Sequence, residues 1–206
     1  MTNVWKLTQR QQNIDLYLQA CANLYGHIMP RRFLLIYNKY NEDKLLKGEL
    51  LQYSNKLNRQ AKNYCIYTNA IINSTVDPEV IDRTIYYQGD KKYYVPEKEE
   101  LLKWVNEKYC PVTPQSEKLK ETLLHKFNVS PLAIGSLMFE LFHSVLIDER
   151  VQAQSDILDK YKVFDKSSVA DFNEFFCKAF IEFANNTRRW ANCGFTPQEM
   201  RDSLKS

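Results

Sequence analysis

Residues 63–72 read NYCIYTNAII, and this short stretch decides the predicted fold of the first half of the chain. Aromatic and β-branched residues flank Asn69 on both sides, a composition that favours strands. The sequence before residue 63 instead has the apolar spacing of amphipathic helices. We therefore predict a short strand pair that follows a helical segment.

Three helices are predicted ahead of this strand pair. Apolar residues recur at helical spacing over residues 8–25, and Gly26 stands where a left-handed C-cap is expected. A second helix is predicted over residues 30–40, because a proline opens it. Asn41 or Asp43 would cap a third helix. Its inward face is expected to consist of five leucines, namely Leu45, Leu46, Leu50, Leu51 and Leu57.

Local sequence signals also predict the structure of the neighbouring segments. Residues 27–29 are expected to form an extended link, since the residue before a proline avoids the α region. After the strand pair, further helices are predicted over residues 77–88 and 96–106, each with a proline in its first turn.

The segment 110–114 (CPVTP) is the predicted boundary between two domains. Two prolines so close together cannot continue a helix and suit a stiff connection. The domains would cover residues 1–110 and 114–206, the second being all helical. Its helices are predicted over residues 116–127, 130–146, 148–161 and from Ser167 or Ser168 to about residue 192.

The stretch NNTRRWANCGFTPQEM, residues 185–200, predicts a corner between two terminal helices. Gly194 can take the left-handed position that ends the first helix, and Thr196 begins a capping box that opens the second. We expect Asn186 and Arg189 to bond to backbone carbonyls or to a carboxylate of the neighbouring layer; a surface that binds a ligand or a partner protein is the alternative. The candidate residues for either role are Asn185, Asn186, Arg188, Arg189, Trp190 and Asn192.

Two segments, KKYYVPEKEELLKW (91–104) and NNTRRWANCGFTPQEM (185–200), resemble a group of uncharacterised bacterial proteins, some of which end in the SEC-C zinc-binding motif. Together they cover about 30 of the 206 residues. The resemblance implies a helical accessory protein and assigns no activity. The sequence contains no Cys-rich tail of the SEC-C kind, so the zinc function of those relatives is not carried over.

The composition is that of an ordinary globular protein, with 44% hydrophobic and 26% charged residues. No apolar run approaches the roughly 20 residues that span a bilayer, and the N-terminus has no apolar signal core. We therefore expect a soluble, cytoplasmic protein with no membrane partner. The five cysteines are an odd number without a C-x-x-C pair, which predicts reduced thiols rather than a disulfide framework.

Sequence motifs for catalysis are missing. His27, His125 and His143 lie far apart, and no H-E-x-x-H or zinc-ligand cysteine pair accompanies them. Glu140 and His143 have the i, i+3 spacing of half a di-iron site, but the required second pair is absent. There is also no G-x-S-x-G and no glycine-rich phosphate loop. We therefore expect no metal and no cofactor, and an enzyme of unrecognised type is the last alternative.

Positive charge is concentrated in residues 1–66, which contain ten basic and four acidic side chains. Three helices and a strand pair in such a segment suit a winged-helix arrangement, in which one helix enters the major groove of DNA. Against this hypothesis, solvated charge is the usual state of a surface helix. The candidate nucleic-acid contacts are Arg31, Arg32, Lys56, Arg59 and Lys62.

Together these patterns predict a mainly α protein (α+β with a minor β element). It would have a winged-helix-like N-terminal lobe and a C-terminal helical bundle. The leading function hypothesis is a non-enzymatic protein-interaction or regulatory module with an unknown protein partner. A DNA-binding regulator that uses the basic N-terminal lobe is the alternative.

Overall fold

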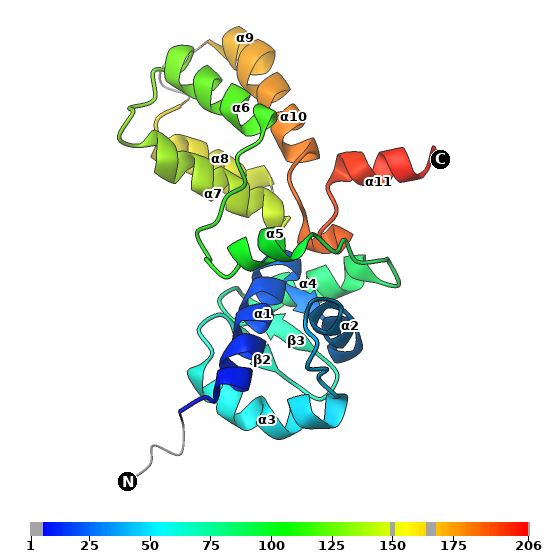
Figure 1. Ribbon diagram of the computed structural model, residues 1–206. Helices are drawn as coiled ribbons and strands as arrows, with labels where there is room; N and C mark the ends of the chain where they lie inside the picture. Colours follow the sequence, from blue (N-terminus) through cyan, green and yellow to red (C-terminus); the bar gives the residue numbers. More distant parts are fainter. Residues whose placement is uncertain (1–5, 149–150, 164–167, 206) are drawn as a thin grey trace. The chain divides into compact units, whose positions relative to one another are not determined.

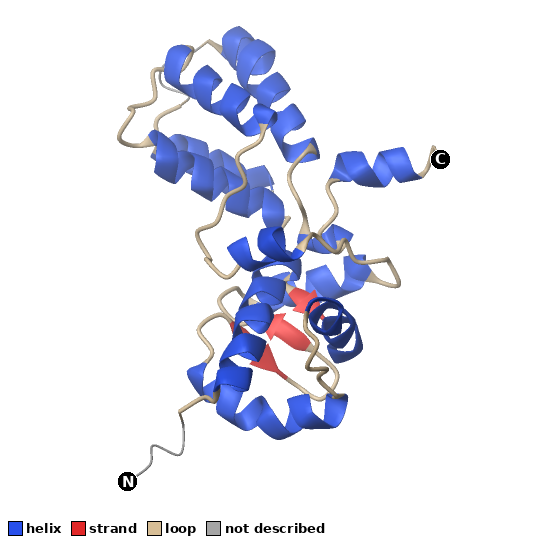
Figure 2. Ribbon diagram, in the orientation of Figure 1, coloured by secondary structure: helices blue, strands red, loops and turns tan. Residues whose placement is uncertain are grey.

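The computed structural model describes residues 6–148, 151–163 and 168–205. The chain divides into two compact units, Met1–Tyr109 and Cys110–Ser206, and this division falls in the proline-containing segment where the sequence predicts a boundary. The predicted mainly α fold with a minor β element is confirmed. Helices dominate the described part of both units, and the described strands form one small sheet (Figure 2).

The N-terminal unit alternates helices with short strands. Its elements, labelled in Figure 1, are α1 (Gln9–Tyr25), β1 (His27–Ile28), α2 (Pro30–Tyr40), α3 (Lys47–Gln60), β2 (Tyr64–Ile66), β3 (Ile71–Asn73), α4 (Pro78–Gln88) and α5 (Lys98–Lys103). β3 pairs antiparallel with both other strands, so the sheet order is β1-β3-β2. The elements α1 to β3 follow the order helix, strand, two helices and a strand pair, and the first strand lies beside the last. This is the topology of a winged helix.

Local sequence signals explain the first helices. The Thr8 hydroxyl accepts a hydrogen bond from a backbone N–H in the first turn of α1, as the capping-box pattern requires. α1 ends before Gly26, whose φ of 67° is the left-handed conformation that favours glycine. The helices predicted over residues 8–25, 30–40 and 77–88 are confirmed to within one residue.

A buried asparagine network joins α1 to the rest of the unit. Asn23 Nδ2 donates to the backbone carbonyl of Trp104 (2.7 Å). Asn23 Oδ1 accepts hydrogen bonds from the Nδ2 atoms of Asn63 (2.6 Å) and Asn73 (3.2 Å). One side chain therefore ties α1 to β3, to the residue before β2 and to the residue after α5.

A second buried network joins β1 to α4. Gln88 Nε2 donates to the carbonyls of Tyr25 (2.8 Å) and His27 (3.1 Å), so Gln88 Oε1 is the atom that lies 2.8 Å from His27 Nδ1. Because that oxygen can only accept, Nδ1 of His27 carries the proton in the neutral ring. Burial lowers the pKa of His27, and this effect outweighs the opposite effect of the hydrogen bond to Gln88. Burial therefore favours the neutral ring.

The third helix begins later than predicted. α3 starts at Lys47, several residues after the predicted caps, and Leu46 is 70% exposed instead of facing inward. The preceding loop explains the error. Asn38 bonds both the N–H (2.8 Å) and the carbonyl (3.0 Å) of Leu45, so an asparagine side chain replaces the bonds of a helical turn.

Two further expectations for this unit need correction. The segment 27–29 is not only a link, because His27 and Ile28 form β1 and pair with Ile72 and Ile71 of β3. A strand of two residues is too short to show alternation in sequence. The helix predicted over residues 96–106 is shorter, since only Lys98–Lys103 are helical and turns follow.

The described residues of the C-terminal unit form helices joined by turns and loops, with no strand among them. Its elements are α6 (Pro114–His125), α7 (Ile134–Leu146), α8 (Val151–Lys160), α9 (Val169–Asp171), the π-helix η2 (Phe172–Cys177), α10 (Lys178–Asn185), the 3₁₀ turn η3 (Trp190–Asn192) and α11 (Pro197–Ser203). α10 packs on α6, and α7 packs on α8. A core of leucine and phenylalanine side chains lies between these helices.

The prediction that the long helix runs to about residue 192 is wrong at its C-terminal end. α10 stops at Asn185, because the side chains of Asn186 and Thr187 bond to the carbonyls of Glu182 (2.9 Å) and Phe183 (2.8 Å) in the last turn. The helix is also interrupted by the π segment at residues 172–177.

The other boundaries of the C-terminal unit differ less from prediction. Residues 131–133 form turns, so α7 begins at Ile134 rather than at the proline. α8 covers Val151–Lys160 of the predicted 148–161, and positions 149–150 lie outside the described residues, as does Ser167. The capping box that opens α11 is confirmed by the bond from Glu199 N–H to the Thr196 hydroxyl (3.1 Å).

Candidate nucleic-acid interface

α3 presents a polar outer face in the N-terminal unit (cyan in Figure 1). Its inward face is held by Leu50 and Leu57, which are fully buried. Gln52, Asn55 and Arg59 are exposed and follow one another at steps of three and four residues, so they share one helical face. Arginine, asparagine and glutamine are the side chains that make paired hydrogen bonds to guanine and adenine in the major groove.

The one acidic residue of α3, Glu49, lies one turn before Gln52, and its carboxylate is bound by Arg10. Arg10 on α1 donates to both carboxylate oxygens of Glu49, at 2.7 and 2.9 Å. The same guanidinium pairs with Asp43 and donates to the carbonyl of Lys44 (3.0 Å) in the loop before α3. The hydrogen bonds from Arg10 lower the pKa of Glu49. The exposed residues of Lys47–Gln60, all described, therefore include no acid.

α3 is also held firmly against the strand pair. Asn58 Nδ2 donates to the backbone carbonyl of Ile66 (3.0 Å), and Asn58 Oδ1 accepts from the Ile66 N–H (2.8 Å). These two bonds link the last turns of α3 to β2. The hairpin loop, in which Tyr67, Thr68 and Asn69 are exposed, is thereby fixed beside the helix, as a wing is.

The five residues predicted to contact nucleic acid fall on two elements. Lys56 is half-buried and Arg59 is exposed on α3, and Lys62 is exposed just after it. Arg31, exposed, and Arg32, half-buried, lie in the first turn of α2. The structure thus groups the three residues near the end of α3.

Sequence reasoning missed two members of this face, because it followed charge alone. Gln52 and Asn55 are uncharged. With Arg59 they form a polar stripe on α3, at helical spacing, away from the buried leucines, and this spacing is a signal that the sequence contains.

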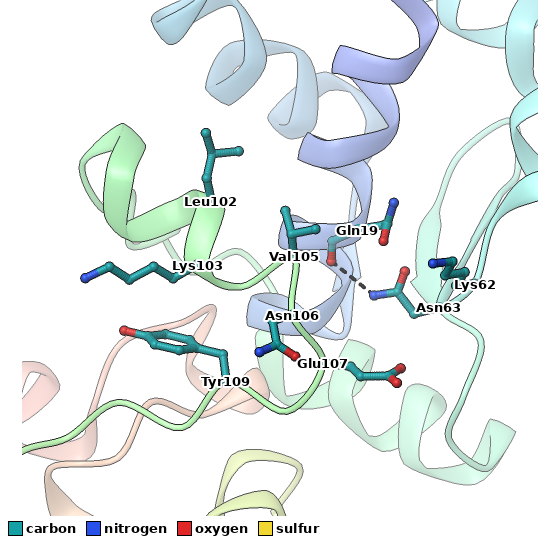
Figure 3. A pocket seen from close by; sticks show the side chains of 9 residues that line it. All are labelled: Gln19, Lys62, Asn63, Leu102, Lys103, Val105, Asn106, Glu107 and Tyr109. Carbon is teal, nitrogen blue, oxygen red and sulfur yellow. Dashed lines mark hydrogen bonds between the residues drawn. The ribbon is translucent and has the colours of Figure 1, made fainter.

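A hollow of about 610 Å³ lies elsewhere in the same unit (Figure 3). Its wall includes Gln19 on α1, and Lys62 and Asn63 before β2. Around the end of α5 it is lined by Leu102, Lys103, Val105, Asn106, Glu107 and Tyr109. The Asn63 side chain is buried, and its Oδ1 has no hydrogen-bond partner among the described residues. The volume lies within the roughly 300–1,000 Å³ of typical small-molecule sites. Its lining mixes both charges with amides and selects no chemistry by itself.

The polar residues of the C-terminal corner mostly bond within their own unit. Arg188 Nη1 donates to the Gly194 carbonyl (3.0 Å) and to Glu199 Oε2 (3.2 Å). Arg189 Nη1 donates to Asp148 Oδ1 (3.0 Å). Trp190 is buried.

The remaining corner residues surround these contacts. Asn186 bonds the end of α10, Asn185 Oδ1 accepts from Arg201 Nη1 (3.3 Å), and Asn192 is half-buried. The bond between Asn185 and Arg201 joins α10 to α11.

The metal-ligating side chains of the described ranges do not gather into a cluster. Among these residues, no three histidine, cysteine, aspartate or glutamate side chains are placed to share a metal ion. Glu140, which has half of a di-iron spacing with His143, instead accepts hydrogen bonds from Lys160 (2.7 Å) and Tyr161 (2.8 Å).

Comparison of the chain with protein-family models, with curated proteins and with solved structures finds no match. None of the helices formed by the described residues combines the length and the hydrophobicity that a membrane crossing requires.

Proposed function

We propose that the protein is a non-enzymatic regulator whose N-terminal unit binds duplex DNA, with α3 in the major groove. One observation carries the proposal: in a winged-helix topology, the helix that would enter the groove exposes Gln52, Asn55 and Arg59 on one face and no acid. Its single carboxylate, Glu49, is bound by Arg10.

Phosphate contacts would come from basic residues around this helix. Lys47 at its start and Lys62 after its end are exposed, as is Arg31 at the start of α2. Such contacts set the register of a protein on the duplex, whereas the side chains on the groove face read the bases. The excess of positive charge in residues 1–66 supports attraction to the backbone.

The proposal is tested by the affinity of the full chain for a fluorescein-labelled duplex, followed by fluorescence anisotropy. Binding should weaken steeply between roughly 50 and 200 mM salt, because phosphate contacts release counterions. Arg59→Ala should lower the affinity on the order of tenfold, as expected for a residue in the groove.

Lys108→Ala is the matched control, since it removes the same charge from an exposed position outside α3. It should change the affinity less than about twofold at the same salt concentration. Equal losses for the two variants would mean that only net charge matters. No binding at low salt would contradict the proposal outright.

A protein-interaction module is the second candidate, and the surface of α4 favours it. Ile85, Tyr86 and Tyr87 are 41%, 81% and 48% exposed, an apolar group of the kind enriched at interfaces. If the protein is an interaction module that uses α4, Tyr86→Ser would abolish binding of a purified protein partner and Arg59→Ala would not. The opposite pattern would favour the nucleic-acid reading.

A further inference from the structure

The C-terminal unit contains an apolar cavity of about 230 Å³ between α7, α8 and the η2–α10 segment. Most of its wall is apolar, and the exceptions are Gln154 and Ser155 on α8 and Cys177 at the end of η2. The Cys177 thiol also donates to Asn173 Oδ1 (3.8 Å). The apolar side chains of the wall are Leu141, Leu158, Phe172, Phe176 and Phe180.

Three phenylalanine rings form a stacked row along this wall. The centroids of Phe172 and Phe176 are 4.8 Å apart with an interplanar angle of 23°, and those of Phe176 and Phe180 are 5.4 Å apart at 12°. Phe127, which is buried and does not line the cavity, packs edge-on against Phe172 and Phe176. The orientation of the row is therefore fixed from outside the cavity, and its ring planes are nearly parallel.

The helix that carries the row is irregular at this place. Residues Phe172–Cys177 form a π-helix within an otherwise α-helical run. π segments are rare and are found frequently at functional sites. Here the irregular turn contributes two of the stacked rings and Cys177 to the cavity wall, whereas Asn173 and Glu174 of the same turn are exposed.

We propose that this cavity binds a small planar aromatic molecule with one polar substituent. Because the faces of Phe176 are covered by Phe172 and Phe180, the row presents ring edges to the cavity. The face of a planar aromatic ligand can pack against these edges in the edge-to-face geometry that aromatic pairs favour, which a flexible aliphatic chain cannot. Gln154 and Ser155 provide the few polar groups that orient a ligand in an otherwise apolar site. The inference is independent of the proposed DNA contact, because it concerns the other unit.

2-Naphthol is a suitable probe, because it is planar and carries a single hydroxyl group. Calorimetry on the full chain should detect its binding, with weaker binding of naphthalene, which lacks the hydroxyl, and of decanoate, which lacks the ring. Binding should also slow the alkylation of Cys177 by N-ethylmaleimide at least fivefold. Cys65 and Cys110 are also half-buried but lie outside the cavity, and their rates should stay unchanged.

A variant pair tests the location. Ser155→Trp fills the cavity from α8 and should abolish binding, whereas Gln152→Trp places the same ring at an exposed position of that helix and should not. If Ser155→Trp does not fold, protection of Cys177 in the unchanged chain still decides the matter. Absence of 2-naphthol binding, binding without protection of Cys177, or tighter binding of decanoate would overturn the inference.

Discussion

Two polar segments, α3 and residues 185–200, have similar side chains but use them differently. In 185–200, Arg188 and Arg189 bond a backbone carbonyl and two carboxylates of their own unit. On α3, the bonds that position the helix come from Arg10 and Asn58, while the stripe at 52, 55 and 59 faces outward. A cluster of asparagine and arginine is therefore a binding candidate where its side chains are exposed on one helical face.

Trp190 is the buried centre of the C-terminal corner, and its removal should affect stability the most. Trp190→Ala should lower the free energy of unfolding of the C-terminal unit by about 3–5 kcal/mol, because it leaves a large cavity. Urea denaturation followed by circular dichroism measures this loss. A change below about 1 kcal/mol would contradict a structural role for the corner.

Two asparagines of α3 should differ in the same way within a single helix, one with a structural role and one exposed. Asn58→Ala removes both bonds to Ile66 and should cost about 1–3 kcal/mol of unfolding free energy. Asn55→Ala, at an exposed position, should stay within about 0.5 kcal/mol of the unchanged chain. Thermal unfolding of the two variants side by side checks the difference. Equal losses would mean that Asn55 also has a structural role.

Gly194 gives a smaller effect in the corner. Its φ of 84° is strained for alanine, so Gly194→Ala should destabilise the chain by about 1 kcal/mol. Gly48→Ala is the control in α3, where φ is not positive and an added Cβ meets no atom within 4 Å. That variant should leave the melting temperature unchanged or raise it. An unchanged melting temperature for Gly194→Ala would argue against the left-handed corner.

The smallest effect concerns pH and the N-terminal unit. The folded state lowers the pKa of His27 by burial, so the unfolded chain takes up its proton first as the pH falls. The contribution of the neutral ring to stability is complete above the unfolded value of about 6.5 and declines below it. Urea midpoints at pH 7.5 and 5.5 should differ less in His27→Gln than in the unchanged chain. His125→Gln, at an exposed position, serves as the control.

Much of the fold could be predicted from the sequence where local signals agree. Gly26 marked the end of α1, and a proline marked the start of α2 and of α4. The strand composition around Asn69 located the hairpin. The errors arose where a side chain bonds the backbone at a distance. The bonds of Asn38 to Leu45 go with the late start of α3, and the bonds of Asn186 and Thr187 end α10. The helix propensity of single residues does not predict such bonds.

The candidate site was predictable only in part. Charge pointed to Arg59 and Lys56, but the role of Arg10 in binding Glu49 requires contact between α1 and α3, which no local pattern specifies. β1 is two residues long, and its pairing with β3, which completes the winged-helix topology, likewise depends on the tertiary fold.

The most direct test of the central claim is photo-crosslinking from α3. A photoreactive p-benzoylphenylalanine replaces Asn55 in one version of the full chain and Ile85, exposed on α4, in another. Irradiation with a labelled duplex at low salt should crosslink DNA from position 55 and much less from position 85. Crosslinking from position 85 alone, or from neither, would contradict the assignment of α3 as the helix that enters the groove.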